Sequence, residues 1–270
     1  RGVNGKNMVS LDEAEFDIVC RKLDEAGIGI NCFGSRIANW GKSIEDPPDS
    51  SIEEARLAVK KMKRLGARLI RIMSFALMKD RSPDDQMKEE RFKRLRDIVS
   101  IFMDEGLQPL HENCMNYGGM GWPYTLEIIE NVPGLKLVFD TGNPVGSIDA
   151  NAENPRALQS SWDFYSHVKE HIEYLHIKDG RFLEFKDGPF HKCEYTYPGD
   201  GDGDVRRIVK DLIMSGYDGG ISIEPHLAVL YHDGDNRPED QIRFDSYVEY
   251  GRRMEKMLNE IKSEIASEQA

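Results

Sequence analysis

Short apolar runs alternate with amphipathic segments along most of this chain, and this alternation constrains the fold more than any other feature. The apolar runs are rich in Ile, Leu and Val and have turn residues beside them. Both features are typical of parallel strands buried on both faces. We therefore predict strands at residues 27–33, 68–75, 107–113, 135–141, 172–178 and 220–225.

Helical segments fill the intervals between the predicted strands. Gly27 and Gly66 follow two of these segments, as C-terminal capping glycines do. The run from Ser51 to Glu54 has the pattern of a capping box at a helix start. The predicted helices cover residues 11–26, 51–66, 84–105, 123–131, 154–170, 205–215 and 238–265.

This order of elements predicts an α/β fold with a parallel sheet and crossover helices. The spacing fits a (β/α)8 TIM barrel, and 270 residues suffice for one domain of that type, which we assign to residues 1–270. Six strands are recognisable in the sequence. We therefore expect the first two strands of the barrel to lie upstream of residue 1.

Four successive predicted strands end in a residue that can bind a metal ion. Active-site residues of TIM barrels lie at the C-terminal ends of the strands, and side chains alternate between two faces along each strand. A consistent register directs one set into the mouth of the barrel: Glu112, Asp140, His176 and Glu224. Three carboxylates and one imidazole suit Mn²⁺, Mg²⁺, Co²⁺ or Zn²⁺. The alternative, an ion-paired strand end, holds better for one such residue than for four.

Charge and cysteine content limit the partners. The net charge of −12 argues against nucleic acid, because phosphate backbones bind to basic surfaces. No apolar run is long enough for a membrane span, so no membrane partner is expected. The four cysteines include no C-x-x-C pair, and their low number favours a reducing, cytoplasmic compartment. A homo-oligomer remains open.

Several motifs together resemble one known family, the xylose-isomerase-like TIM barrels, often called sugar phosphate isomerases/epimerases. The resemblance covers nearly the whole chain and implies the TIM-barrel fold. It rests on RIMSF (71–75), HEN (111–113), FDTGN (139–143), HIKDGR (176–181), PGDGDG (198–203) and GYDGGISIEPHL (216–227).

The resemblance also implies roles for individual residues. The four strand-end residues match the metal ligands of the family, and Glu112 and Glu224 also match its acid/base pair. Lys178 and Asp179 match an HxKD motif. One position departs from the pattern, because Asn143 stands where many members carry histidine after the Asp-Thr-Gly segment.

Further side chains near the strand ends are predicted to act on a substrate. Lys178 shares the inward face of His176 and is predicted to bind a substrate oxygen or act as a general acid, with a salt bridge to a neighbouring acid as the alternative. Arg71 either reaches the mouth or makes a structural pair, and Trp40 is either a platform for a sugar or a buried packing residue. The insert at residues 181–198 is predicted to form a lid. The predicted substrate contacts are Asn113, Asn143, Arg181, His226, Trp40 and Arg71.

These residues favour a metal-dependent isomerase or epimerase acting on a sugar or keto-polyol. A bound cation would polarise the substrate carbonyl and stabilise an enediolate, while Glu112 and Glu224 remove and return a proton. A lyase or dehydratase would use the same residues. A phosphodiesterase is a weaker alternative, because it calls for more histidine ligands and a basic groove. A binding protein without turnover is disfavoured by the intact set of four ligands.

Overall fold

The computed structural model describes residues 2–3, 5–187, 191–227 and 238–269, and the chain divides into two compact units. Unit 1 comprises residues 1–118 and 123–138, and unit 2 comprises residues 119–122 and 139–270. That residues 1–270 form a single domain stays a prediction.

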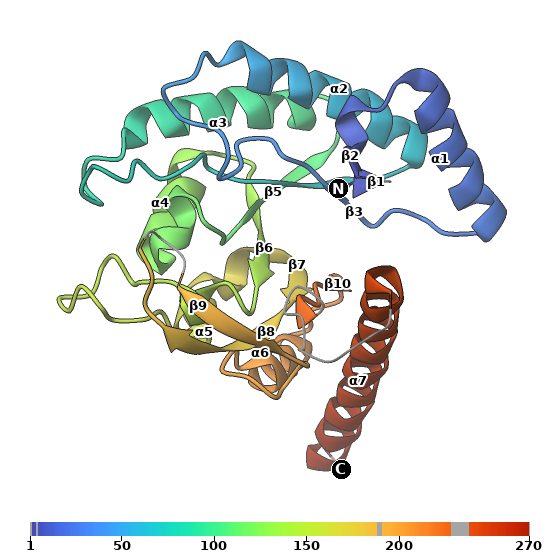
Figure 1. Ribbon diagram of the computed structural model, residues 1–270, viewed down its shortest axis with the longest axis vertical. Coiled ribbons are helices and arrows are strands. Elements are labelled where there is room, and N and C mark those ends of the chain that lie inside the picture. Colours follow the sequence, from blue (N-terminus) through green and yellow to red (C-terminus); the bar gives the residue numbers. More distant parts are fainter. Residues whose placement is uncertain (1, 4, 188–190, 228–237, 270) are drawn as a thin grey trace. The chain divides into compact units, whose positions relative to one another are not determined.

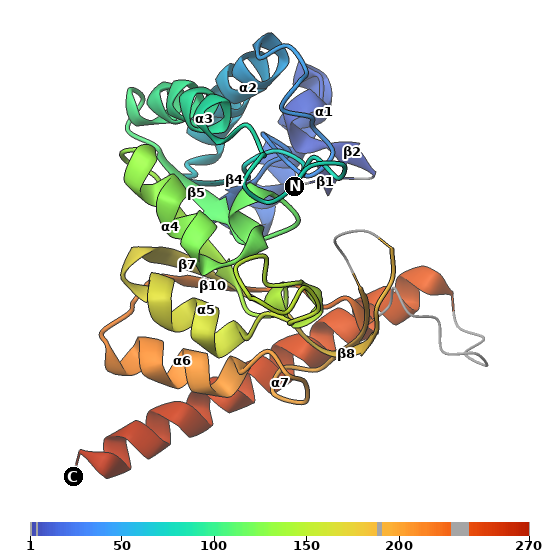
Figure 2. The ribbon, with the colours of Figure 1, turned by 90° about the vertical axis from the view of Figure 1, so that its left-hand side faces the viewer.

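Unit 1 consists of parallel strands with helices between them, after a short antiparallel pair. Figures 1 and 2 show two of its helices, α2 and α3, side by side along the strands. Its elements are β1 (Gly2–Val3), β2 (Lys6–Asn7), η1 (Met8–Ser10), α1 (Glu13–Ala26), β3 (Cys32–Gly34), α2 (Asp49–Leu65), β4 (Leu69–Ile72), α3 (Lys88–Met103), β5 (Gln108–Glu112), the start of η2 (Tyr117–Met120), α4 (Trp122–Asn131) except its first residue, and the start of β6 (Lys136–Asp140).

The strands of unit 1 are parallel neighbours in the order β3, β4, β5, β6. The register places Arg71 opposite Leu110 and Glu112 opposite Val138. Residues 109–112 of β5 are all buried, as the prediction of strands covered on both faces requires. The helices supply the covering apolar side chains, which on α3 include Phe92, Leu95, Ile98 and Phe102.

Two local predictions in unit 1 need correction. The first strand begins at Cys32 rather than at residue 27, because Gly27 adopts a left-handed conformation (φ 63°) that caps α1. Helix α2 begins at Asp49, and its N-cap is Pro48 with no side-chain hydrogen bond, so the capping box predicted at Ser51 is wrong. Proline has a fixed φ that suits a helix start. The capping box lies instead on α1, between Asp12 and Glu15.

Unit 2 contains the end of β6, two further strands of the sheet and a hairpin. The strand order continues from β6 to β7 and β10, and β10 runs parallel to β7 with Ser222 opposite His176. Figure 2 shows α5 and α6 as neighbours in this unit. Its elements are η3 (Pro144–Gly146), α5 (Ser161–Val168), η4 (Lys169–His171), β7 (Ile172–Ile177), β8 (Asp179–Glu184), β9 (Lys192–Thr196), α6 (Val205–Met214), β10 (Gly220–Ile223) and α7 (Glu239–Glu268).

Helical periodicity explains how α6 and α5 close the core of unit 2. Val205, Ile208, Val209 and Leu212 are buried, which is the spacing of one face of a helix. Helix α5 is shorter than predicted and begins at Ser161, because the Ser160 hydroxyl accepts the N–H of Asp163 and caps it there. Among the described residues, every helix is too short or too polar to cross a bilayer.

The insert predicted as a lid is largely an antiparallel hairpin of β8 and β9. It packs closely on η3: the backbone N–H of His191 donates to the carbonyl of Gly146 (3.3 Å). A Cβ atom on Gly146 would lie 2.4 Å from Cys193 Sγ, so only glycine permits this approach. That the hairpin covers a site stays a prediction.

Candidate metal centre

Asp140 is the last residue of β6, and its carboxylate is held by the turn that follows it. Its Oδ1 accepts the backbone N–H groups of Gly142 (2.9 Å) and Asn143 (2.8 Å). The Asp-Thr-Gly-Asn sequence thus folds back on its own first side chain, as aspartates commonly do in turns. Asp140 is fully buried, so its position is fixed by the strand end and the turn together.

His176 and Glu224 meet on the neighbouring strands of unit 2. His176 Nδ1 lies 3.2 Å from Glu224 Oε1. Glu224 directly follows β10, and its backbone N–H donates to the carbonyl of Ile177 at the end of β7 (2.8 Å). His176 is buried, whereas the Glu224 side chain is 32% exposed. Glu224 is therefore the member of this pair that solvent can reach.

Lys178 places a positive charge between the carboxylates of this cluster. Its Nζ lies 3.0 Å from Asp140 Oδ2 and 3.8 Å from Glu224 Oε2, with only 7% of the side chain exposed. The Thr141 hydroxyl donates to the Lys178 carbonyl (2.7 Å) and lies 3.2 Å from the Lys178 backbone nitrogen. The structure thus contains the salt bridge that was the alternative interpretation of this lysine.

The donor set of unit 2 fits a divalent cation. One ligand atom from each of Asp140, His176 and Glu224 lies within 4.8 Å of the others. Ligands bonded at about 2.1 Å to one ion lie about 3–4 Å apart, so a small contraction would close the set around an ion. Carboxylate oxygens and an imidazole nitrogen suit the divalent ions predicted from the sequence.

Glu112 ends β5 in unit 1 and has a buried partner of opposite charge. Arg71 Nη1 lies 3.0 Å from Glu112 Oε2, and both side chains are almost fully buried. The Asn116 side-chain amide donates to the Glu112 carbonyl (3.1 Å). Arg71 thus makes the structural pair that was one of its two predicted roles. Asn113, the next residue along, is also buried.

His111 points away from Glu112, as expected for neighbouring strand residues. Its Nε2 lies 3.0 Å from Ser74 Oγ and 3.1 Å from Asn116 Oδ1. Complete burial lowers the pKa of His111 to about 4, against opposing effects of the Asn116 hydrogen bond and the Glu112 charge. His111 is therefore a neutral packing residue at pH 7.

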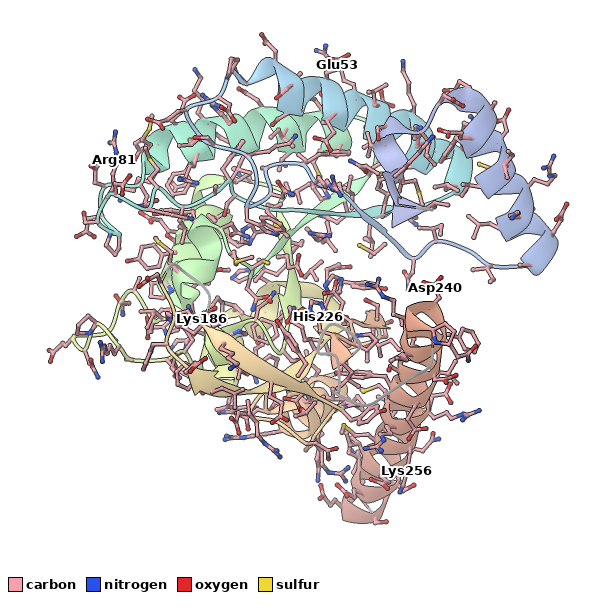
Figure 3. All side chains as sticks on the ribbon, in the orientation of Figure 1. Glu53, Arg81, Lys186, His226, Asp240 and Lys256 are labelled. Carbon is pink, nitrogen blue, oxygen red and sulfur yellow. The ribbon has the colours of Figure 1, made fainter. Side chains whose placement is uncertain are left out.

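The remaining predicted substrate residues have different surroundings. His226, labelled in Figure 3, lies with Nε2 3.8 Å from Glu224 Oε2, and its ring is 4.8 Å from that of Tyr195 on β9. Asn143 Nδ2 is buried and has no hydrogen-bond partner within the described part of the chain. Arg181 is exposed on β8 and donates to the carbonyl of Asp200.

Trp40 lies in a loop of unit 1 with 44% of its surface exposed. The interpretation of Trp40 as a buried packing residue is therefore wrong. Its predicted role as a platform for a sugar is untested.

The sequence motifs did not indicate the structural role of Asp179. Its buried carboxylate accepts backbone N–H groups from Gly180, Gly199, Gly201 and Gly203, at 2.8–3.1 Å. Burial raises the pKa of Asp179, and these four hydrogen bonds oppose that shift. Asp179 therefore organises the PGDGDG loop beside Lys178. The feature of the sequence that could have indicated this role is the glycine-rich loop. No buried acceptor had been assigned to the backbone N–H groups of that loop.

Comparison with known proteins decides the family. The sequence matches the family described as Xylose isomerase-like TIM barrel over residues 4–244. The chain belongs to the xylose isomerase-like TIM barrel family. The predicted α/β TIM-barrel fold is thereby confirmed. The two strands expected before residue 1 stay a prediction.

Several solved structures resemble this one at low sequence identity. A family protein from Mycobacterium smegmatis in complex with magnesium has a TM-score of 0.67 and 17% identity, with 95% of this chain and 80% of that chain covered. An L-ribulose 3-epimerase has a TM-score of 0.66 and 14% identity, with 96% and 86% covered. The probable 3-DHS dehydratase AsbF from Bacillus anthracis has a TM-score of 0.59 and 17% identity, with 87% and 82% covered. No curated protein matches the sequence.

Proposed function

We propose that the protein is a divalent-metal-dependent isomerase or epimerase acting on a sugar or keto-polyol. The observation that carries this proposal is the meeting of Asp140, His176 and Glu224 at the ends of three strands. The similar structures include an L-ribulose 3-epimerase and a family protein crystallised with magnesium, which supports both the reaction class and the metal.

Glu112 is proposed as the fourth ligand, and the argument comes from strand register. Glu112 is paired with Val138 on β6, and Asp140 follows two residues later on the same strand. Paired residues of parallel strands point to the same face, and so do residues two apart on one strand. This register supports the proposal that Glu112 faces the same side of the sheet as Asp140.

The chain's own groups then carry out the proton chemistry. A bound divalent cation would act as a Lewis acid toward a substrate carbonyl. Glu224, partly exposed and held by His176, is proposed to remove a proton from the carbon beside that carbonyl. Glu112, held by Arg71, is proposed to return a proton. Lys178, Asn113, Asn143, Arg181, His226, Trp40 and Arg71 are the proposed substrate contacts.

A lyase or dehydratase on a keto-sugar is the second candidate. The structural similarity to a probable dehydratase favours it. It would use the same ligands and differ in expelling a group beta to the enediolate, for which Lys178 is the proposed proton donor.

Other proposed properties follow from the sequence. A small carbohydrate is the proposed partner, nucleic acid and membranes are not proposed as partners, and a homo-oligomer is untested. All four cysteines lie in the described residues and none is disulfide-bonded, which is compatible with the proposed cytoplasmic location.

A substrate screen in D2O tests the proposed function. Protein loaded with Mn²⁺, Mg²⁺, Co²⁺ or Zn²⁺ would be incubated with a panel of ketoses, and the products followed by NMR. The proposal expects metal-dependent incorporation of deuterium at the carbon beside the carbonyl, with an epimer or aldose as product. Loss of water or cleavage of the substrate would favour the lyase, and deuterium exchange that is equal with and without metal would contradict metal dependence.

A further inference from the structure

We propose that the Lys178 ammonium is a placeholder cation, which occupies the candidate metal centre in the metal-free protein and moves off Asp140 when a divalent ion binds. This inference rests on the proposed metal centre. It adds that Lys178 competes with the metal ion for the carboxylates of that centre. It predicts that the lysine weakens metal binding while stabilising the protein without metal.

The contacts of Lys178 support this role. Its Nζ approaches Asp140 Oδ2 (3.0 Å) and Glu224 Oε2 (3.8 Å), which are oxygens of two candidate metal ligands. Asp140 Oδ1 already accepts two backbone N–H groups, so Oδ2 is the Asp140 oxygen left for a metal ion. The ammonium therefore lies against the Asp140 oxygen that a metal ion would bind.

The local charge favours replacement of the Lys178 ammonium by the metal ion over binding of both at the same place. The proposed fourth ligand, Glu112, already has its charge balanced by Arg71. The remaining charges are the two negative charges of Asp140 and Glu224 and the one positive charge of Lys178. A divalent ion alone would balance the two carboxylates, whereas an ion together with an ammonium at this distance would leave excess positive charge. Charges of like sign a few ångströms apart in a buried site repel strongly. Entry of the ion should therefore expel the ammonium from its contact with Asp140.

The backbone of Lys178 confines this movement to the side chain. Thr141 bonds to both the carbonyl and the N–H of Lys178, so the peptide stays attached to β6. A Cβ on Gly142 would lie 2.8 Å from Lys178 Cγ, which shows how closely the side chain passes the turn after Asp140. Glu224 marks the exposed side of the cluster, and a Lys178 released from Asp140 would turn in that direction, where a substrate would bind.

Calorimetric titration of the full chain with Mn²⁺ at constant pH tests the inference. Lys178→Met should bind Mn²⁺ at least about tenfold more tightly than the wild type, because breaking a buried pair leaves an uncompensated carboxylate that attracts a cation. The matched control is Lys169→Met, which removes a lysine 3.0 Å from Asp211 in the same unit and should leave Mn²⁺ affinity unchanged.

Thermal unfolding provides a second measurement. If Lys178 had a purely structural role, its removal would lower the Tm without enlarging the rise in Tm that Mn²⁺ causes. Without metal, Lys178→Met should have a lower Tm than the wild type, and saturating Mn²⁺ should raise its Tm by more than it raises that of the wild type. If Lys178→Met does not fold, Lys178→Gln is measured by the same criteria.

The outcomes separate this inference from the proposed function. Equal or weaker Mn²⁺ binding by the variant, with normal binding by the wild type, would overturn the placeholder role and leave the metal centre standing. Failure of both proteins to bind any of the divalent ions would overturn the metal centre and the placeholder role together.

Discussion

Glu112 and Glu224 differ in the partners that hold their carboxylates. Glu112 is buried against Arg71, whereas Glu224 is partly exposed beside His176. In a two-base reaction both must transfer a proton, so Glu112→Gln and Glu224→Gln should each retain metal and lose turnover by about 10²-fold or more. Steady-state kinetics on metal-loaded variants measure this loss, with Glu173→Gln on the exposed side of β7 as the control.

A one-base mechanism would give a different pattern. Near-normal turnover in either metal-loaded glutamine variant would end the two-base proposal, although it would leave the metal centre standing. Normal turnover in Glu173→Gln is needed to show that the losses are specific to the centre.

His111 gives a prediction about pH. Its folded pKa of about 4 lies below its ordinary value of 6.5, so the unfolded chain binds a proton in that interval and the folded chain does not. Its contribution to stability is complete above about pH 6.5 and is lost as the pH falls toward 4, by about 2–3 kcal/mol. Urea unfolding of wild type and His111→Gln, measured in metal-free buffer at pH 7 and pH 4.5, should show a larger loss of stability in the wild type, by about 2 kcal/mol or more. Parallel pH profiles of the two proteins would contradict it.

At the scale of elements, the glycine-rich loop depends on Asp179. Asp179→Asn removes a charge from a buried site, yet its amide would confront two backbone N–H groups that now donate to a carboxylate. We expect a loss of about 2 kcal/mol or more in the free energy of unfolding, as for other buried donors left unpaired. Asp202→Asn, an exposed change in the same loop, should cost little. Equal stability of the two variants would refute the anchoring role of Asp179.

The elements also show what a single sequence predicts well. All six predicted strands are present, because each apolar run has the composition of a buried strand and adjoins a helix. Capping residues shifted the boundaries of two elements. Gly27 caps α1 instead of opening a strand, and Pro48 starts α2 ahead of Ser51. The β8–β9 hairpin was missed, since β8 lacks a regular alternation of polar and apolar residues and its docking depends on Gly146, which is distant in sequence.

At the scale of the whole molecule, strand ends were enough to suggest the centre. Parallel strands bring their C-terminal ends to one edge, so Asp140, His176 and Glu224 were predictable as neighbours from their positions alone. The salt bridge of Lys178 to Asp140 remained one of two alternatives. Sequence spacing predicts the face of the strand from which a side chain projects. The partner that the side chain contacts depends on its rotamer and on the turn after β6.

Metal binding should change the stability of the whole chain. An ion that binds the folded state alone adds about 2.7 kcal/mol at a free concentration of one hundred times its Kd. Mn²⁺ should therefore raise the Tm, and EDTA should reverse the rise. Asp140→Asn should abolish most of the shift, whereas Asp163→Asn, an exposed change on α5, should preserve it. A shift that persists in Asp140→Asn would place the bound ion elsewhere.

Anomalous diffraction from crystals grown with Mn²⁺ tests the metal centre most directly. The account predicts one strong anomalous peak within about 2.0–2.4 Å of oxygens of Asp140, Glu224 and Glu112 and of an imidazole nitrogen of His176, with Lys178 Nζ no longer in contact with Asp140. A peak at another position, or none near these four side chains at saturating Mn²⁺, would contradict it.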